Sequence, residues 1–283
     1  MDFRFGDHVV GLEDDGKGVT VRFDKASDER FDAVIVAEGV GSSTRELLFP
    51  GQNDPRWMDL TIAYFTIPRT QDDDRLWRWY HATEGRSVSL RPDRHGTTRA
   101  MLTVQKPQVG EQDWSVGKQK AWLTETFGDV GWEARRVLSA MASADDFYFD
   151  VLRQVRLPRW SSGRVALTGD AAWCATPLAG IGSTLAVTGG YVLAGELALA
   201  ESIEEGLAAY EAAMRPMVEK GQGVPKIGPR LMNPHTRVGI RLLHGALKIA
   251  SRPPVRDVAA KLIADPPEGP DLSRYDGDVR AAS

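Results

Sequence analysis

One stretch of the chain places a carboxylate at the end of a buried strand. Arg164 to Thr168 is a short apolar run that predicts such a strand, and it ends at Gly169 and Asp170. Ligands of open α/β sheets bind beyond the carboxyl ends of the strands. The Asp170 carboxylate could accept charge-assisted hydrogen bonds there from a polyol such as a ribityl chain. The alternative is that Gly169 and Asp170 form only a turn.

The residues after Asp170 form a loop that could hold a flat, anionic ring. Gly180 and Gly182 would let the backbone approach such a ring closely, because glycine has no side chain. The helix predicted from Thr184 to Ala200 would point its free N–H groups at the ligand, and a helix N-terminus stabilises an adjacent anion. A reduced flavin carries negative charge at its pyrimidine edge, so this geometry suits a flavin. A loop with an ordinary helix cap is the alternative.

Metal and nucleophilic chemistry have no comparable pattern. The five histidines are scattered and none pairs with a cysteine or an acid at the spacing of metal ligands, so no metal site is predicted. The single cysteine, Cys174, has no histidine near it in sequence, which favours a small buried residue over a nucleophile. The acidic run from Asp72 to Asp74 is interpreted as a solvated turn.

Composition narrows the classes of partner. The 283 residues carry a net charge of -4, and this lack of a basic surplus argues against a nucleic-acid partner. The most apolar segment, Leu185 to Ala200, is shorter than the ~20 residues that span a bilayer and contains Glu196, so no integral membrane segment is expected. Neither a leader pattern at the start nor a cysteine pair is present, which predicts a cytoplasmic location. These patterns leave the oligomeric state open.

The flanking elements predict an α/β protein with an inserted antiparallel sheet. Alternating residues at Val9 to Leu12 and Val19 to Phe23 predict a hairpin, and the apolar run Phe31 to Ala37 predicts a strand buried on both faces of a parallel sheet. Four strand-like stretches separated by turns predict the antiparallel sheet, at residues 59–68, 76–81, 87–91 and 98–105.

Helical periodicity dominates the remainder. Helices are predicted over residues 118–127, 132–142, 184–200, 203–222 and 238–250, with a long strand over 147–157 and a loosely ordered tail from Arg252. Gly189, Gly190 and Gly195 each cost a helix roughly 1 kcal/mol relative to alanine, so close packing on a sheet is expected to compensate. The sequence predicts a partial nucleotide-binding domain in two segments, residues 1–50 and 151–222. A sheet domain, residues 51–150, lies between these segments, and a C-terminal helix with a tail covers residues 223–283.

Aromatic residues gather on two of the predicted strands. Tyr64 and Phe65 lie on one, and Trp77, Trp79 and Tyr80 on the other. Alternate residues of a strand share a face, so Trp77 and Trp79 should point together. Core packing is one interpretation, since aromatics are common in strands. The other is an apolar pocket for a planar or polycyclic substrate, lined by Tyr64, Trp77 and Trp79.

Two motifs resemble a known family. Gly163 to Ala172, followed by Pro177, Gly180 and Gly182, resembles the second flavin motif of the class A aromatic hydroxylases, which are para-hydroxybenzoate hydroxylase-like FAD-dependent monooxygenases. The continuation to Leu197 is similar to the branch that includes tetracycline-inactivating monooxygenases. A further stretch, from Phe31 to Arg45, is similar to the family's middle motif, with Glu38 where aspartate is usual.

The resemblance implies a doubly wound FAD- and NAD(P)-binding fold with FAD as cofactor. NAD(P)H would serve as reductant, and one oxygen atom of O2 would be transferred to an aromatic small molecule. Asp170 would contact the ribityl chain, Pro177 would lie beside the ring, and the backbone of Gly182, Ser183 and Thr184 would meet the pyrimidine edge. No side chain is assigned as a general base.

The middle motif, with Gly39 and Arg45, would by the same resemblance help to hold FAD and to meet the nicotinamide. The substitution by Glu38 leaves that residue's own contacts undetermined.

The family also begins with a strand, a Gly-x-Gly-x-x-Gly turn and a helix that bind the FAD pyrophosphate. Gly39 to Thr44 imitates only the first half of that turn. The expectation is an N-terminally truncated fold, or a start assigned too late, and weak retention of FAD by the chain as given. Two alternatives remain: an inactive remnant that only binds a small molecule, and another flavoprotein on the same scaffold, such as a halogenase or a reductase.

Overall fold

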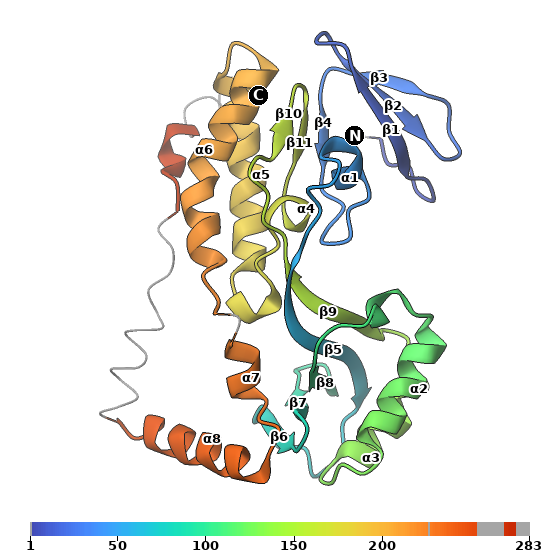
Figure 1. Ribbon diagram of the computed structural model, residues 1–283, viewed down its shortest axis with the longest axis vertical. Coiled ribbons are helices and arrows are strands. Elements are labelled where there is room, and N and C mark those ends of the chain that lie inside the picture. Colours follow the sequence, from blue (N-terminus) through green and yellow to red (C-terminus); the bar gives the residue numbers. More distant parts are fainter. Residues whose placement is uncertain (1, 226, 254–268, 276–283) are drawn as a thin grey trace. The chain divides into compact units, whose positions relative to one another are not determined.

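The structure is a computed structural model that describes residues 2–225, 227–253 and 269–275 (Figure 1). It divides into two compact units. Among the described residues, the first unit holds those up to Arg56, those from Arg153 to Val224 and those from 269 to 275. The second unit holds those from Trp57 to Leu152 and those from Pro225 to 253. The described residues of the predicted segment 223–283 are divided between the two units.

The first unit contains two small sheets. Their strands are β1 (Val9–Asp14), β2 (Val19–Phe23) and β3 (Glu29–Phe31) in one sheet, and β4 (Val34–Val36), β10 (Ser161–Ser162) and β11 (Val165–Leu167) in the other. The predicted hairpin is confirmed, since β1 pairs antiparallel with β2 and Leu12 lies opposite Val21. In the second sheet the order is β10-β11-β4, and β11 runs parallel to β4.

The predicted strand from Phe31 to Ala37 is wrong as a single element. The chain changes sheets within it: Phe31 pairs with Val19 in the antiparallel sheet, whereas Val34 pairs with Val165 in the parallel one. The burial on both faces is also wrong, because Phe31 and Ile35 are 39% and 38% exposed and only Val36 is buried. An apolar run cannot show that its two halves bond to different neighbours.

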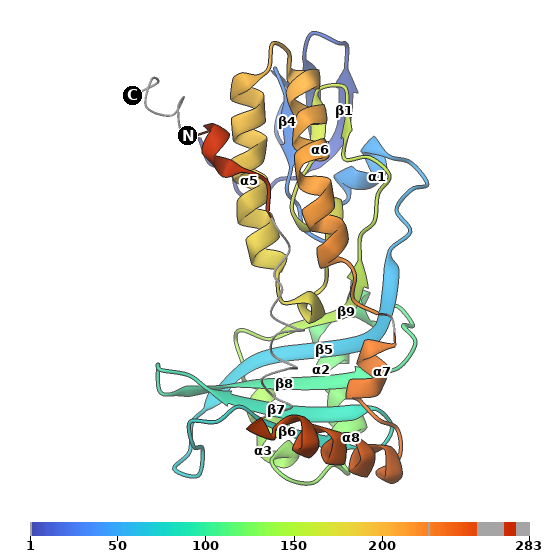
Figure 2. The same ribbon diagram turned by 90° about the vertical axis from the view of Figure 1, so that its left-hand side faces the viewer.

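Two long helices accompany the second of these sheets. The helical elements of the unit are α1 (Thr44–Leu48), α4 (Asp170–Trp173), the 3-10 turn Pro177–Ala179, α5 (Gly182–Leu199), α6 (Ile203–Gly221) and the 3-10 turn Leu272–Tyr275. Helices α5 and α6 lie side by side as a hairpin, as both views show (Figures 1 and 2). Ser202 caps α6 by accepting a hydrogen bond from the Glu205 N–H. The core between helices and sheet includes Trp160, Trp173 and Tyr210 in mutual ring contact.

The second unit is an antiparallel sheet covered by helices. Its strands, in the order β6-β7-β8-β5-β9, are β6 (Arg78–Ala82), β7 (Arg86–Pro92), β8 (Thr97–Gln105), β5 (Arg56–Pro68) and β9 (Tyr148–Gln154). The helical elements are the 3-10 turn Glu111–Asp113, α2 (Val116–Phe127), α3 (Ala134–Met141), α7 (Gly228–Met232) and α8 (Arg237–Ala250). Helices α2 and α3 pack on one face of the sheet and share its hydrophobic core, while α7 and α8 lie on the other side (Figure 2).

The predicted elements of this unit are present with ends shifted by a few residues. Helix α7 was not predicted, because five residues that include Pro229 are too short to show a period. The predicted loose tail lies mostly outside the described residues. Its described part contains Tyr275, which is buried and packs against Gly195 of α5.

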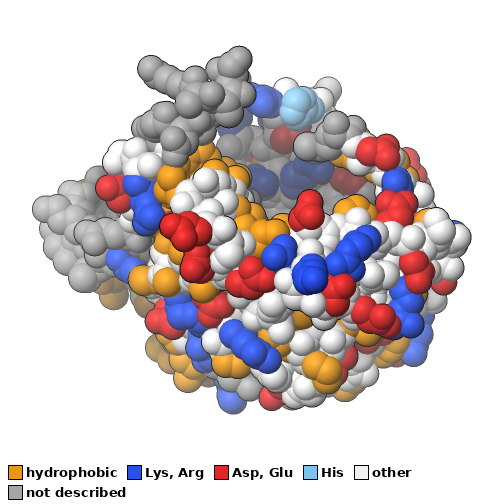
Figure 3. Space-filling model, turned by 90° about the horizontal axis from the view of Figure 1, so that it is seen from above, with side chains coloured by type: hydrophobic (Ala, Val, Ile, Leu, Met, Phe, Trp, Pro, Cys, Tyr) orange, Lys and Arg blue, Asp and Glu red, His pale blue; other side chains and the backbone are white. Residues whose placement is uncertain are grey.

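Two features of the surface bear on partners. Within the described residues, no helix combines the length and the apolar character that crossing a bilayer requires. On the face shown in Figure 3, Lys and Arg side chains are interspersed with Asp and Glu rather than gathered by sign.

Candidate flavin site

A cavity opens where the carboxyl ends of β4 and β11 meet the start of α5. It has a volume of about 640 Å3. Among the residues that line it are six of those predicted from the sequence: Gly169, Asp170, Pro177, Gly180, Gly182 and Ser183. The folding of β11, the loop and α5 thus brings together residues that span a stretch of fifteen positions. All of them belong to the first unit.

Backbone conformation at the cavity explains two of the glycines. Gly169 has φ 59° and ψ -145°, a region that is open almost only to glycine. Gly180 has φ 69°, the left-handed conformation that ends the 3-10 turn at Pro177–Ala179. Thr176 also has a positive φ, 73°, and is strained because its side chain is branched; its hydroxyl accepts a hydrogen bond from the Leu178 N–H. The turns before α5 are therefore fixed by special backbone geometry.

The glycines on the cavity leave room in front of them. Beyond its immediate chain neighbours and its own helix backbone, a methyl group built on Gly169, Gly180, Gly182 or Gly190 would meet no atom within 4 Å. Packing inside the protein therefore does not demand glycine at these positions. The positive φ requires glycine at two of them, Gly169 and Gly180. At Gly182 and Gly190 glycine provides access of a ligand to the backbone, and a planar ring system is a ligand that uses such access.

Asp170 begins α4 directly after Gly169. Its side chain is exposed toward the cavity, yet the surrounding protein withdraws water from the carboxylate and raises its pKa, while a hydrogen bond with the Cys174 thiol acts in the opposite direction. A carboxylate with incomplete hydration gains more from hydroxyl donors than a fully hydrated one does. The residue is thus suited to bind a polyol.

The N-terminus of α5 is available to a ligand. Its N-cap residue, Ile181, has no polar side chain with which to cap the helix, so the first N–H groups are left for a ligand or for water. Ser183 lines the cavity, and Thr184 lies in the same first turn. A helix of eighteen residues presents a partial positive charge at this end, which would favour an anionic ring edge.

The three glycines inside α5 serve different purposes. A methyl group on Gly189 would lie 2.9 Å from the Trp173 ring, and one on Gly195 would lie 2.3 Å from the Tyr275 ring. Glycine is needed at these two positions because aromatic rings pack directly on the helix there. The prediction that a sheet packs on them was wrong. Gly190 has open space in front of it and lines the cavity. The sequence did not distinguish it from its neighbour.

The middle motif has mainly structural contacts. The Glu38 carboxylate accepts hydrogen bonds from the Ser42 hydroxyl at 2.8 Å, the Thr44 hydroxyl at 2.7 Å and the Thr44 N–H at 3.1 Å, so it caps the start of α1. The Arg45 guanidinium is buried and donates to the carbonyl oxygens of Ala171 and Val40. Neither Gly39 nor Arg45 is among the residues that line the cavity described above. Arg45 instead ties this motif to α4.

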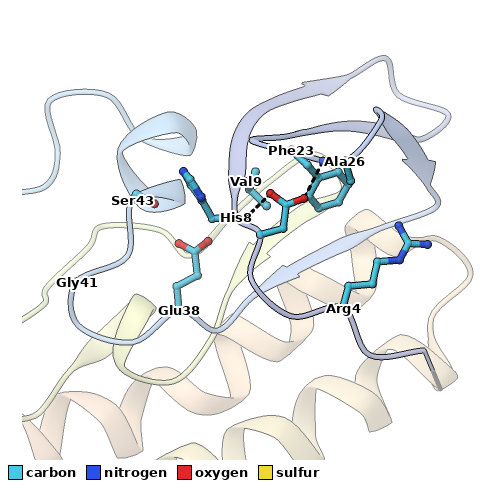
Figure 4. Close-up of a pocket in the computed structure, with 9 residues that line it drawn as sticks. Arg4, His8, Val9, Phe23, Ala26, Glu38, Gly41 and Ser43 are labelled. Carbon is cyan, nitrogen blue, oxygen red and sulfur yellow. Dashed lines mark hydrogen bonds between the residues drawn. The ribbon is translucent and has the colours of Figure 1, made fainter.

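A second cavity, of about 450 Å3, lies beside the middle motif (Figure 4). Arg4, His8, Glu38 and Ser43 are among its lining residues. Figure 4 shows the His8 ring and the Glu38 carboxylate on the same side of it. Burial acts to raise the pKa of Glu38, but its hydrogen bonds and the nearby His8 outweigh burial and lower it. Glu38 therefore stays ionised at neutral pH.

Near this cavity, ligand atoms of Asp7, His8 and Asp24 lie within 4.8 Å of one another, which the sequence did not predict. The Asp7 carboxylate already accepts hydrogen bonds from the N–H groups of His8, Lys25 and Ala26. These bonds tie the start of the chain to the turn after β2. They account for the cluster, and we assign no metal to it.

The aromatic residues of the second unit divide between two faces of its sheet. Trp77 and Trp79 stack at 5.6 Å between ring centres, which confirms that they point together. Tyr64 shares their face, because residues paired across neighbouring strands lie on the same face of a sheet. The pairs run across the sheet from Tyr64 to Met101, from Met101 to Ser89, and from Ser89 to Trp79. Phe65 is on the other face, buried against α2 and α3.

The two tryptophans are not core residues. They are 56% and 38% exposed, and Tyr64 is 36% exposed, so the core interpretation does not hold for them. The Trp77 indole N–H donates to the Ser89 hydroxyl at 3.0 Å, and the Trp79 indole N–H donates to the Ser87 hydroxyl at 2.7 Å. These bonds fix both rings on an accessible surface.

Sequence reasoning missed the polar residues that support this surface. The Ser87 hydroxyl bonds to the Thr103 hydroxyl at 2.6 Å, and Thr103 in turn donates to the Asn233 side-chain oxygen at 2.9 Å. His81 continues the stack beneath Trp79. The signal was present in β7, where Ser87 and Ser89 alternate with Val88 and Leu90, because residues two apart share a face.

Comparison with known proteins assigns the family. Residues 1–221 match the family described as FAD binding domain, and this chain belongs to that family. FAD is accordingly the cofactor of the fold. The chain is 31% identical over 281 residues to the FAD-dependent monooxygenase asL6 of Sarocladium schorii, covering 96% of this chain and 66% of that protein. It is 36% identical over 264 residues to monooxygenase CTB7 of Cercospora beticola, covering 88% and 63%.

Solved structures agree with the sequence relatives. The crystal structure of tetracycline destructase Tet(51) matches with a TM-score of 0.73 and 28% identity, over 87% of this chain and 66% of that one. The resemblance to class A FAD-dependent monooxygenases and to their tetracycline-inactivating branch is confirmed, as is the mixed α/β fold with an inserted antiparallel sheet. The chain spans less than two thirds of the length of each of these three proteins.

Proposed function

We propose that this chain acts in an FAD-dependent monooxygenase that inserts one oxygen atom of O2 into an aromatic or polycyclic small molecule, with NAD(P)H as reductant, in the cytoplasm. The observation that carries the proposal is the glycine-lined cavity between β11 and α5. When bound, FAD supplies the transfer of electrons from NAD(P)H to O2 and of an oxygen atom to the substrate.

The residues of the cavity would bind and orient the cofactor. Asp170 would accept hydrogen bonds from the ribityl hydroxyls, and Pro177 would lie against the ring. The N–H groups of Gly182, Ser183 and Thr184, in the first turn of α5, would meet the anionic edge of the reduced ring. Gly190 would leave the space into which the cofactor extends.

The exposed aromatic surface of Tyr64, Trp77 and Trp79 would bind the substrate. Stacked indoles offer a flat apolar contact, and their N–H groups are already occupied by Ser87 and Ser89. Such a surface favours a planar or polycyclic substrate over a small polar one. Replacing Trp79 by alanine should raise KM for the substrate and leave the affinity for FAD unchanged.

The proposal is tested with purified protein, FAD, NAD(P)H and a set of planar aromatic compounds in a buffer that contains chloride, under isotopically labelled O2. The expected result is substrate-dependent oxidation of NAD(P)H and incorporation of one labelled oxygen atom. Binding of an aromatic compound without any such oxidation, in protein shown to hold FAD, would support the alternative of a small-molecule-binding protein. Oxidation that yields a halogenated or reduced product would assign another flavoprotein chemistry.

A further inference from the structure

One region of the chain has a charge pattern unlike the rest. Between Glu219 and Asp257 the sequence contains eight Lys and Arg residues and no acid, in a chain whose net charge is -4. The described part of this region includes α7 and α8 of the second unit. Neither the cavity nor the aromatic surface explains why basic residues are concentrated there.

Helix α8 carries two parallel stripes of opposite character. Val238, Leu242 and Ile249 follow one another at intervals of four and seven residues and therefore share a face. The basic stripe has the same intervals, displaced by one residue: Arg237, Arg241 and Lys248. A displacement of one residue turns the stripe by about 100° around the helix. The basic stripe thus flanks the apolar one along its whole length.

The apolar stripe faces solvent. Val238, Leu242 and Ile249 are 63%, 69% and 56% exposed, and no residue of this fourteen-residue helix is buried. Ile227 and Leu231, at the start of α7 and within it, add two further apolar side chains that are 59% and 61% exposed. Single apolar residues on a surface are ordinary, but five exposed aliphatic side chains in one short segment indicate an interaction site.

The side of the helix that points away from the apolar stripe attaches it to the sheet. The His244 ring lies within hydrogen-bond distance of the His81 ring on β6, at 3.1 Å, and α8 packs against that strand. Asn233, just before α8, is held by Thr103 of β8. His244 lies seven residues after Arg237 and four before Lys248, so the helix is attached beside its basic stripe. The apolar stripe points away from this attachment, and the side chains of the basic stripe remain exposed.

The charge decides between the possible partners of this surface. A second copy of the chain would bring two basic stripes together across a twofold interface, where like charges repel. An anionic membrane surface attracts Lys and Arg and accepts an apolar stripe at the boundary between headgroups and acyl chains. We propose that α8, with Ile227 and Leu231, binds the chain peripherally to anionic membranes. The helix lies in the plane of the interface and does not cross the bilayer.

The test is flotation of the full chain with phosphatidylcholine vesicles that contain or lack phosphatidylglycerol. The expected result is binding to the anionic vesicles that weakens as salt is raised, and at least about tenfold weaker binding to the neutral ones. Leu242→Glu and Arg241→Glu should each reduce binding to anionic vesicles about tenfold or more. Val109→Glu, at an apolar residue of the same unit that is 66% exposed, is the matched control and should bind as the original chain does.

Three results would overturn the proposal. One is absence of flotation with anionic vesicles while circular dichroism shows folded protein. The second is binding that Leu242→Glu and Arg241→Glu leave unchanged. The third is a dimer in analytical ultracentrifugation that Leu242→Glu dissociates, without vesicle binding, which would assign the surface to a second copy. None of these measurements depends on FAD or on oxygen transfer, so the result is independent of the proposed function.

Discussion

The Asp170 carboxylate is less hydrated in the folded chain than in the unfolded chain, and this raises its pKa. Between the ordinary pKa and the raised one, the folded chain binds more protons than the unfolded chain does. The free energy of unfolding therefore falls as pH rises through that interval, which is opposite to the usual effect of a paired carboxylate. In the absence of a ligand, the ionised Asp170 carboxylate therefore lowers the free energy of unfolding.

We expect Asp170→Asn to separate stability from cofactor binding. At pH 7 the variant should have a higher free energy of unfolding than the original chain, and this gain should vanish below the ordinary pKa of aspartate, about 4. Its affinity for FAD should fall roughly ten- to hundredfold, since hydrogen bonds to a charged group are lost. Urea titrations at several pH values and flavin fluorescence titrations measure the two effects. Asp145→Asn, at an exposed residue of the second unit, is the control, and an unchanged FAD affinity in Asp170→Asn would refute the role.

Glu38 makes the opposite prediction for pH. Its pKa is lowered, because hydrogen bonds from Thr44 and Ser42 outweigh the effect of burial. The stability it contributes is present at neutral pH and is lost as pH falls through the lowered pKa. Replacing Glu38 by alanine should cost about 1 kcal/mol at pH 7, the usual value of a helix cap, and less in acid. Urea titrations at several pH values measure this loss of stability. A loss that is the same at every pH would show that the stabilisation does not come from the ionised carboxylate.

At the scale of elements, α5 offers two adjacent glycines with opposite expected responses. Gly190→Ala should raise the free energy of unfolding by about 0.5 to 1 kcal/mol, because alanine favours a helix and the methyl group meets nothing. Gly189→Ala should lower it, because the methyl group would press on the Trp173 ring. Thermal unfolding of both variants measures this contrast. If both changes stabilise the chain equally, the packing of Trp173 on α5 is not as described.

The same helix also tests the cavity. Gly190→Leu should fold, because the position faces open space, but the larger side chain would enter the cavity and weaken FAD binding. The reduction should be much larger than that caused by Gly190→Ala. Full FAD affinity in a folded Gly190→Leu protein would show that the cofactor does not occupy this part of the cavity.

At the scale of the whole molecule, the described residues form two separate hydrophobic cores. One core includes Trp160, Trp173 and Tyr210, the other includes Phe65, Leu102 and Phe127, and they share no residue. Two independent cores allow two unfolding transitions in place of a single cooperative one. Saturating FAD should raise only the transition of the first unit, by about 2.7 kcal/mol of stability at a hundredfold excess over its Kd. Calorimetry with and without FAD measures this, and Trp173→Ala identifies the transition of the first unit.

Much of the candidate site could be predicted because it depends on local sequence. The glycines and the proline between Asp170 and Thr184 specify turns and a helix start through their own backbone preferences. Alternation along the predicted strand 76–81 likewise placed Trp77 and Trp79 on one face, because the side-chain period of a strand is two residues. These features need no knowledge of distant residues.

Other features depend on neighbours that are remote in sequence. The division of Phe31 to Ala37 between two sheets follows from pairing with Val19 on one side and with Val165 on the other. The different roles of Gly189 and Gly190 follow from the position of the Trp173 ring. The exposure of Trp77 and Trp79 follows from the fact that α2 and α3 cover the other face of the sheet. The sequence by itself determined the family, the turns and the periods of the elements. Only the tertiary structure decided what each face meets, since packing joins segments whose spacing along the chain carries no signal.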